Sequence, residues 1–130
     1  MLQITGLFAG ILALIIIVLA YNVVNFRRSK KCGIGDNGDK AGLLAIRTHA
    51  NAVEYIPMLI ILMASYEING GPSIALYVIG GLAVVARIMH AFGLSNSAGV
   101  SFGRFYGTLI TWLLIITLAV LNIVQFIMNL

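Results

Sequence analysis

Four long, mainly apolar stretches alternate with shorter polar connections along the chain. They cover Ile4–Phe26, Leu43–Glu67, Ser73–Leu94 and Gly107–Leu130. Each is longer than twenty residues, which at about 1.5 Å rise per residue is enough to cross a hydrocarbon core of about 30 Å. The pattern predicts an all-α, four-helix transmembrane bundle that forms a single membrane domain over residues 1–130.

The connections between these stretches carry turn and packing signals. The first is basic and rich in glycine, FRRSKKCGIGDNGDK, and the second, EINGGPS, has Gly-Gly-Pro as a turn signal. The third reads LSNSAGVSFGR. Within the third apolar stretch, the small residues Gly80, Gly81, Ala83 and Ala86 are expected to allow close helix contacts.

The few charges are distributed unevenly, in a chain that is 61% hydrophobic and 9% charged. All cations lie at or near the first and third connections: Arg27, Arg28, Lys30, Lys31, Lys40, Arg47, Arg87 and Arg104. This asymmetry predicts that both connections face the cytoplasm and that both termini lie on the other side. The net charge of +4 therefore reflects membrane topology. We expect anionic lipid head groups as its partners, and no nucleic acid.

The second apolar stretch begins with a polar motif, RTHANAVEYIP. At 100° per residue, Arg47, Asn51 and Glu54 fall at about 0°, 40° and −20°, so they form one narrow stripe, with Tyr55 at its edge at about 80°. Such a stripe can hold a bundle together as an internal ion pair. Because ionisable residues inside a membrane usually mark a functional interior, the stripe favours a binding site, with Arg47 reaching towards Asn51 and Glu54 close to both.

Two other residues of this motif bear on assembly and shape. His49 lies at about 200°, nearly opposite the stripe, and would face a neighbouring protomer if this helix lies at a subunit interface. Pro57 falls in mid-helix and is expected to bend it.

Further cations are expected at the same depth as the stripe. Arg87 and His90 share one helix face near the end of the third stretch, and Arg87 is open to two interpretations, a site role or extension to the lipid head groups. Arg104 precedes the fourth stretch, and Arg27 or Arg28 ends the first. Together with the single acid Glu54, these cations suit an elongated polyanionic small molecule that also carries an amine.

The sequence offers no chemistry of its own beyond this cluster. One cysteine and two separated histidines give no metal-ligand spacing, so we expect no metal site. Nor does any serine or cysteine have an evident base beside it. A nucleophile would therefore have to arrive with a cofactor.

Taken together, the four helices, RTHANAVEYIP, RIMHAFG and the arginine before the fourth helix resemble the MAPEG family, the membrane-associated proteins in eicosanoid and glutathione metabolism. The chain is similar to the family's small bacterial members. The resemblance implies a multi-pass protein of the bacterial inner membrane that forms a homotrimer. It also implies that glutathione is the cofactor, bound between adjacent subunits.

The resemblance assigns roles to residues at matching positions. Arg104 would stabilise the glutathione thiolate. The remaining site residues would bind the rest of glutathione from the same or the neighbouring subunit: Arg47, Asn51, Glu54, Tyr55, His90, His49, and Arg27 or Arg28. Leu94 stands where the well-studied enzymes tend to have a tyrosine, so the surroundings of the thiol differ from theirs.

The resemblance thus predicts a glutathione S-transferase or peroxidase-like enzyme that acts on hydrophobic electrophiles drawn from the bilayer. Two alternatives remain. One is a non-catalytic binding or structural membrane protein with the same fold. The other is a small multidrug transporter, but such exporters resemble one another in a glutamate on the first helix, and Ile4–Phe26 contains no acid.

Overall fold

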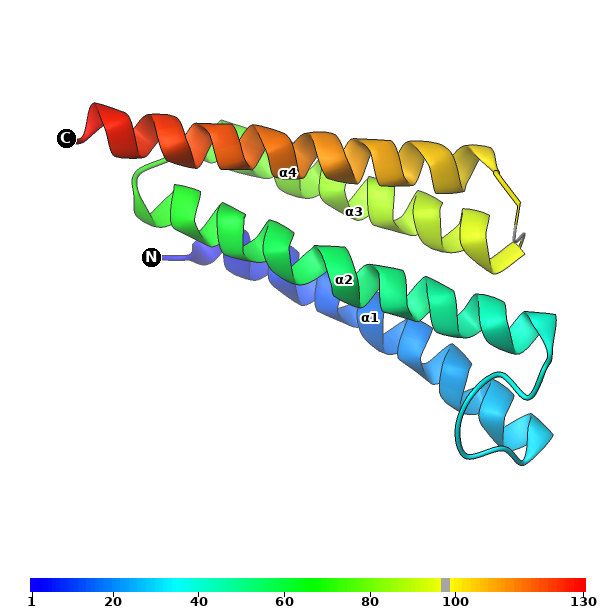
Figure 1. The fold of residues 1–130 in the computed structure, drawn as a ribbon. Coiled ribbons are helices and arrows are strands. Elements are labelled where there is room, and N and C mark those ends of the chain that lie inside the picture. The colour runs from blue at the N-terminus through cyan, green and yellow to red at the C-terminus, as the bar shows by residue number, and fades with distance from the viewer. Residues whose placement is uncertain (97–98) are drawn as a thin grey trace.

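The computed structural model describes residues 1–96 and 99–130. It consists of the helices α1 (Gln3–Lys30), α2 (Lys40–Ile68), α3 (Ser73–Asn96) and α4 (Phe102–Met128). The helices run up and down in one bundle, with both termini at one end and the α1–α2 and α3–α4 connections at the other (Figure 1). All four are long and apolar enough to cross a membrane, and the described ranges contain no strand. The all-helical prediction with four spans is confirmed.

Three helices extend at one end by three or more residues beyond the apolar stretches. α1 continues to Lys30, α2 begins at Lys40 and α4 begins at Phe102. Hydropathy marks where the chain leaves the hydrocarbon, whereas a helix ends where its terminal backbone groups find other partners. Here a left-handed residue, Lys31 with φ 53°, ends α1, and the side chain of Ser101 accepts a hydrogen bond from a backbone N–H in the first turn of α4.

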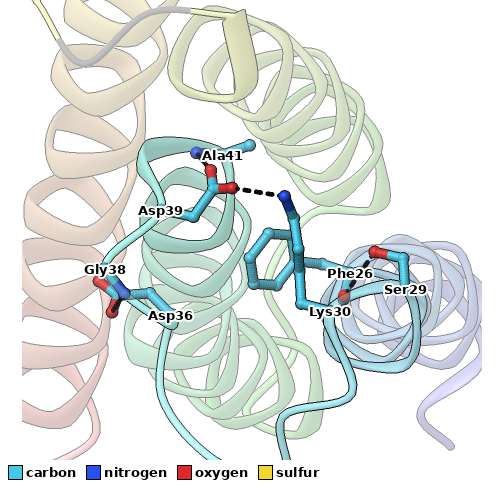
Figure 2. Close-up of polar contacts among 7 residues, drawn as sticks. All are labelled: Phe26, Ser29, Lys30, Asp36, Gly38, Asp39 and Ala41. Carbon is cyan, nitrogen blue, oxygen red and sulfur yellow. Dashed lines mark hydrogen bonds and ion pairs between the residues drawn. The ribbon is translucent and has the colours of Figure 1, made fainter.

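The α1–α2 connection is fixed by an ion pair that also caps a helix (Figure 2). Asp39 accepts a backbone hydrogen bond from Ala41 at 2.8 Å, and its other oxygen lies 2.9 Å from Lys30 Nζ. The Lys30 ammonium holds the pKa of the Asp39 carboxyl below its usual value. Next to this pair, the Phe26 ring packs so closely against Gly42 that a Cβ there would collide with it. These contacts set where α2 starts relative to the end of α1.

At the end of the bundle that carries the termini, α2 caps α1. The Glu67 carboxylate accepts hydrogen bonds from the backbone N–H groups of Ile4 at 3.0 Å and Thr5 at 2.7 Å. These donors have no partner within α1, and a negative charge there also interacts favourably with the helix dipole. The turn that follows uses Asn69 and Gly70, the latter with φ +83°. The predicted tight turn between the second and third helices is therefore confirmed, but it forms at Asn69 and Gly70 and so begins one residue before the Gly-Gly-Pro signal.

The two central helices hold the bundle together. α2 and α3 each contact all three other helices, whereas α1 and α4 do not touch within the described chain. The half nearer the termini is filled by an apolar core that includes Leu59, Met63, Leu76 and Leu118. The buried polar side chains with a charge or a ring, Arg87 and His90, lie in the other half together with Thr48, while Thr5 is buried near the termini. The half that contains Arg87 and His90 is called the polar half.

Close packing of α3 against α4 depends on two glycines of α4. A Cβ on Gly103 would lie 2.5 Å from the Met89 carbonyl oxygen, and one on Gly107 would lie 2.6 Å from that of Ala86. Small residues spaced by four let two membrane helices approach to backbone contact. In α3 itself, Gly80 packs against the Phe8 ring as expected.

The expectation that Gly81 also makes a close helix contact is wrong. A Cβ added there would meet no atom within 4 Å. Gly81 is one residue, or about 100°, further round the helix than Gly80, and so points away from the contact that Gly80 makes.

Replacing Gly107 with alanine should destabilise the bundle, while Gly81→Ala should not. Both changes raise helix propensity, by up to about 1 kcal/mol in an exposed helix. Only Gly107→Ala forces α3 and α4 apart, which typically costs about 1–3 kcal/mol. Thermal unfolding in mild detergent, followed by circular dichroism, should give a lower midpoint for Gly107→Ala than for Gly81→Ala. Equal midpoints would show that the α3–α4 contact tolerates a Cβ.

Candidate functional site

A cavity of about 340 Å³ opens in the polar half of the bundle. Its walls come from α2, α3 and α4, and the residues that line it are Leu43, Leu44, Arg47, Asn51, His90, Leu94, Arg104 and Thr108. Four residues predicted from sequence as site residues, on three helices, therefore lie around one space. A larger cavity of about 560 Å³ between α1 and α3 is mainly apolar and contains no charged residue. Another cavity, of about 420 Å³, also includes Arg104 and Thr108, but its lining comes from α4 and the segment before it. The 340 Å³ cavity is the one that brings Arg104 together with polar residues of α2 and α3.

On α2, the predicted stripe is present, but its internal contacts differ from the prediction. Arg47 Nη2 lies 3.6 Å from Glu54 Oε1, and the two side chains are 53% and 52% exposed. Asn51 bonds to neither residue and turns to α3 instead. The expectation that Arg47 reaches Asn51 is therefore wrong, because Asn51 accepts a hydrogen bond from an arginine of the neighbouring helix instead.

That donor is Arg87, which is 1% exposed. Its Nη2 donates to Asn51 Oδ1 at 2.6 Å and lies 3.3 Å from His90 Nδ1, and its guanidinium carbon is 5.9 Å from the centre of the Tyr55 ring. Extension of Arg87 to the lipid head groups, one of its two interpretations, is wrong, because the side chain points into the bundle.

The guanidinium of Arg87 has no acidic partner. The ion pairs among the described residues join Lys30 to Asp39 and Arg47 to Glu54. Arg87 Nε and Nη1 are buried and make no hydrogen bond. A buried charge held only by neutral acceptors is costly. An anion in the adjoining cavity, next to Asn51 and His90, would reduce that cost.

Arg104 is held at the beginning of α4, on the side of the cavity opposite α2. Its backbone N–H donates to the Ser101 hydroxyl at 3.3 Å, its Nη1 donates to the Gly99 carbonyl at 3.3 Å, and its carbonyl accepts from the Thr108 hydroxyl at 2.9 Å. The helix cap therefore fixes the backbone from which the guanidinium extends. Thr108 lines the cavity one turn further along α4.

Several predicted site residues do not line this cavity within one chain. Tyr55 lies against Arg87, and Glu54 reaches the cavity only through its ion pair with Arg47. His49 is half-buried elsewhere on α2.

The two arginines near the end of α1 are also separate from the cavity. Arg27 Nε donates to the Gly35 carbonyl at 3.3 Å in the α1–α2 connection, and Arg28 is exposed. Neither lines the cavity in this chain. A role for either one, or for His49, in binding depends on a second copy.

Comparison with known families matches residues 5–124 to the MAPEG family. The chain belongs to this family. The inner membrane protein YecN of Escherichia coli K12 is 35% identical to it over 91 residues, 70% of each chain, and YecN of E. coli O6:H1 gives the same values. The MAPEG match includes every residue that lines the cavity.

In this MAPEG protein, one polar residue of the cavity lining, Thr108, is not among the site residues predicted from the sequence. Thr108 stands one turn after Arg104, so the helical period alone places it on the same face. For Arg87 the sequence leaves both a site role and extension to the lipid head groups open, because the neighbouring residues do not indicate whether a cation near a helix end points inward. The polar lining now consists of two arginines, an amide, an imidazole and a hydroxyl, with no acid. Such a lining favours anionic ligands.

Proposed function

We propose that this chain binds glutathione and is a glutathione-dependent transferase or peroxidase-like enzyme that acts on hydrophobic electrophiles. One observation carries the proposal: Arg47, Asn51, His90 and Arg104 line a single cavity, with Glu54 paired to Arg47 at 3.6 Å. Glutathione carries two carboxylates, one amine and one thiol. A cavity rich in donors, with one acid at its edge, matches that set of groups. Membership of the MAPEG family supports the same ligand.

Within the proposal, Arg104 activates the thiol. A guanidinium keeps its charge and offers fixed N–H donors, so it stabilises a thiolate without itself giving up a proton. The thiolate sulfur then forms a bond to an electrophilic carbon, and the leaving group departs with the electrons of the broken bond. With a peroxide, the sulfur attacks one oxygen, an S–O bond forms and the O–O bond breaks, and the other oxygen leaves as an alkoxide that takes a proton from water. A second glutathione thiol then reacts with the sulfenic acid to give the disulfide and water. The acceptor reaches the site from the bilayer.

The proposed setting is the inner membrane, with four crossings. The apolar helices and the similarity to the inner membrane protein YecN support it. The placement of both termini outside the cytoplasm stays a prediction from the positions of the cations.

Arg104→Ala should reduce conjugation of a model electrophile by about a hundredfold or more, the scale for losing one donor to a developing anion. Affinity for glutathione should fall far less, because Arg47 and Asn51 remain. Lys31→Ala removes an exposed cation from the end of α1 and serves as the matched control. Turnover and the ultraviolet absorbance of bound thiolate are the two measurements. If both persist in Arg104→Ala, another group activates the thiol.

Glu54→Gln should weaken glutathione binding about tenfold. A hydrogen bond to a charged group contributes roughly 1.5–3 kcal/mol, and the bond proposed between the glutathione amine and the half-exposed Glu54 carboxylate should lie near the lower end of that range. Calorimetry with glutathione and with an analogue that lacks the amine isolates the interaction. The analogue should bind both proteins equally. An equal loss for both ligands would mean that Glu54 acts through Arg47 and not on the amine.

We further propose a homotrimer in which a neighbour's α1 and α2 cover the open side of the cavity. The half-exposed Arg47–Glu54 pair and the position of His49 on another face of α2 support this assembly. The mass in mild detergent should be three times that of one chain, and His49→Ala should lower glutathione affinity although His49 does not line its own chain's cavity. A monomer that binds glutathione fully would contradict the assembly.

A further inference from the structure

The hydrogen bonds of Arg87 determine how its two partners are oriented. A guanidinium can only donate. The Asn51 atom at 2.6 Å from Arg87 Nη2 must therefore be the amide oxygen, which leaves the amide NH₂ on the other branch of the same group. Likewise, the ring nitrogen of His90 that lies 3.3 Å from Nη2, Nδ1, must present a lone pair. A neutral imidazole with an unprotonated Nδ1 carries its hydrogen on Nε2.

Both partners also line the cavity. We propose that Arg87 is a positioning residue which makes Asn51 and His90 hydrogen-bond donors towards the cavity. The wall formed by Asn51 and His90 then selects a carboxylate and disfavours a ligand group that can only donate. The inference rests on the proposed function only in taking that carboxylate to be one of glutathione's two.

The surroundings of Arg87 restrict any other arrangement. The side chain is 1% exposed, and the Tyr55 ring covers it at 5.9 Å. His90 is 2% exposed, and its ring lies 3.3 Å from Arg87 Nη2 through Nδ1. Asn51 is tied by the shortest of these bonds. All three side chains are thus held before a ligand enters.

The positions of Asn51, His90 and Glu54 also determine which end of the ligand binds where. The cavity lining includes no acid, and Glu54 lies outside it, paired to Arg47. An amine placed against Asn51 and His90 would meet only donors, while a carboxylate there would also approach the uncompensated charge of Arg87. A carboxylate therefore belongs against Asn51 and His90, and the amine belongs at the edge where Glu54 lies.

The first test reads the imidazole directly. The chain has two histidines, so ¹⁵N-histidine labelling gives two ring systems, with His49 as the internal control. In the protein without ligand, His90 should show the Nε2–H tautomer. Arg87→Met removes the donor and should convert His90 to a mixture of tautomers, while the His49 signals stay unchanged; Arg87→Lys should restore the Nε2–H form. An Nδ1–H tautomer in the unaltered protein overturns the proposal, and this result does not require that any variant folds.

The second test reads the ligand. Converting one of the two glutathione carboxylates to an amide should reduce affinity for the unaltered protein about tenfold, and the reduction should vanish in Arg87→Met. If glutathione binds but both mono-amides bind as tightly as glutathione itself, the proposed selection of a carboxylate by Asn51 and His90 is wrong while the proposed function stands. If glutathione does not bind and His90 still shows the Nε2–H tautomer, the proposed function fails while the role of Arg87 in orienting His90 stands.

Discussion

The guanidinium of Arg87 is buried inside the bundle without a carboxylate, and the polar half of the structure is arranged around it. A charge in such a place must be satisfied by acceptors, because desolvation of an unpaired ion is prohibitive. The acceptors are an amide oxygen from α2 and a ring nitrogen from one turn along α3, with an aromatic face beside them. The register between α2 and α3 is therefore tied to one hydrogen-bonded group, and the same group forms the back of the cavity.

The parts of this arrangement that depend on one helix at a time could be predicted from the sequence. Hydropathy predicts four spans, and the helical period places Arg47, Asn51 and Glu54 on one stripe. The choice of partner within the stripe could not be predicted in the same way. Asn51 bonds to Arg87, which is 36 residues away in the chain, and a helical angle contains no information about which neighbouring helix lies opposite.

The α3–α4 contact gives a second example of this limit. The segment GRFYG, from Gly103 to Gly107, contains two glycines spaced by four. Close helix packing was expected at the small residues of α3 instead. Of these, Gly80 meets Phe8 whereas Gly81 meets nothing. Composition indicates that a helix can pack closely somewhere along its length. Only the assembled bundle determines which face does so, and here that face brings Gly107 against the backbone and Cβ of His90.

A division of labour between the helices follows from these contacts. His90 and Arg104 belong to α3 and α4, which are in backbone contact, so in the proposed glutathione complex this contact would set the distance between the carboxylate at His90 and the thiol at Arg104. The amine of the proposed ligand would meet α2, where Glu54 and Arg47 are half exposed and pair with each other. An exposed ion pair is weak and adjustable. In the proposed trimer, a neighbouring subunit would complete this edge. Assembly would then strengthen binding of the amine without moving the groups proposed to bind the carboxylate and activate the thiol.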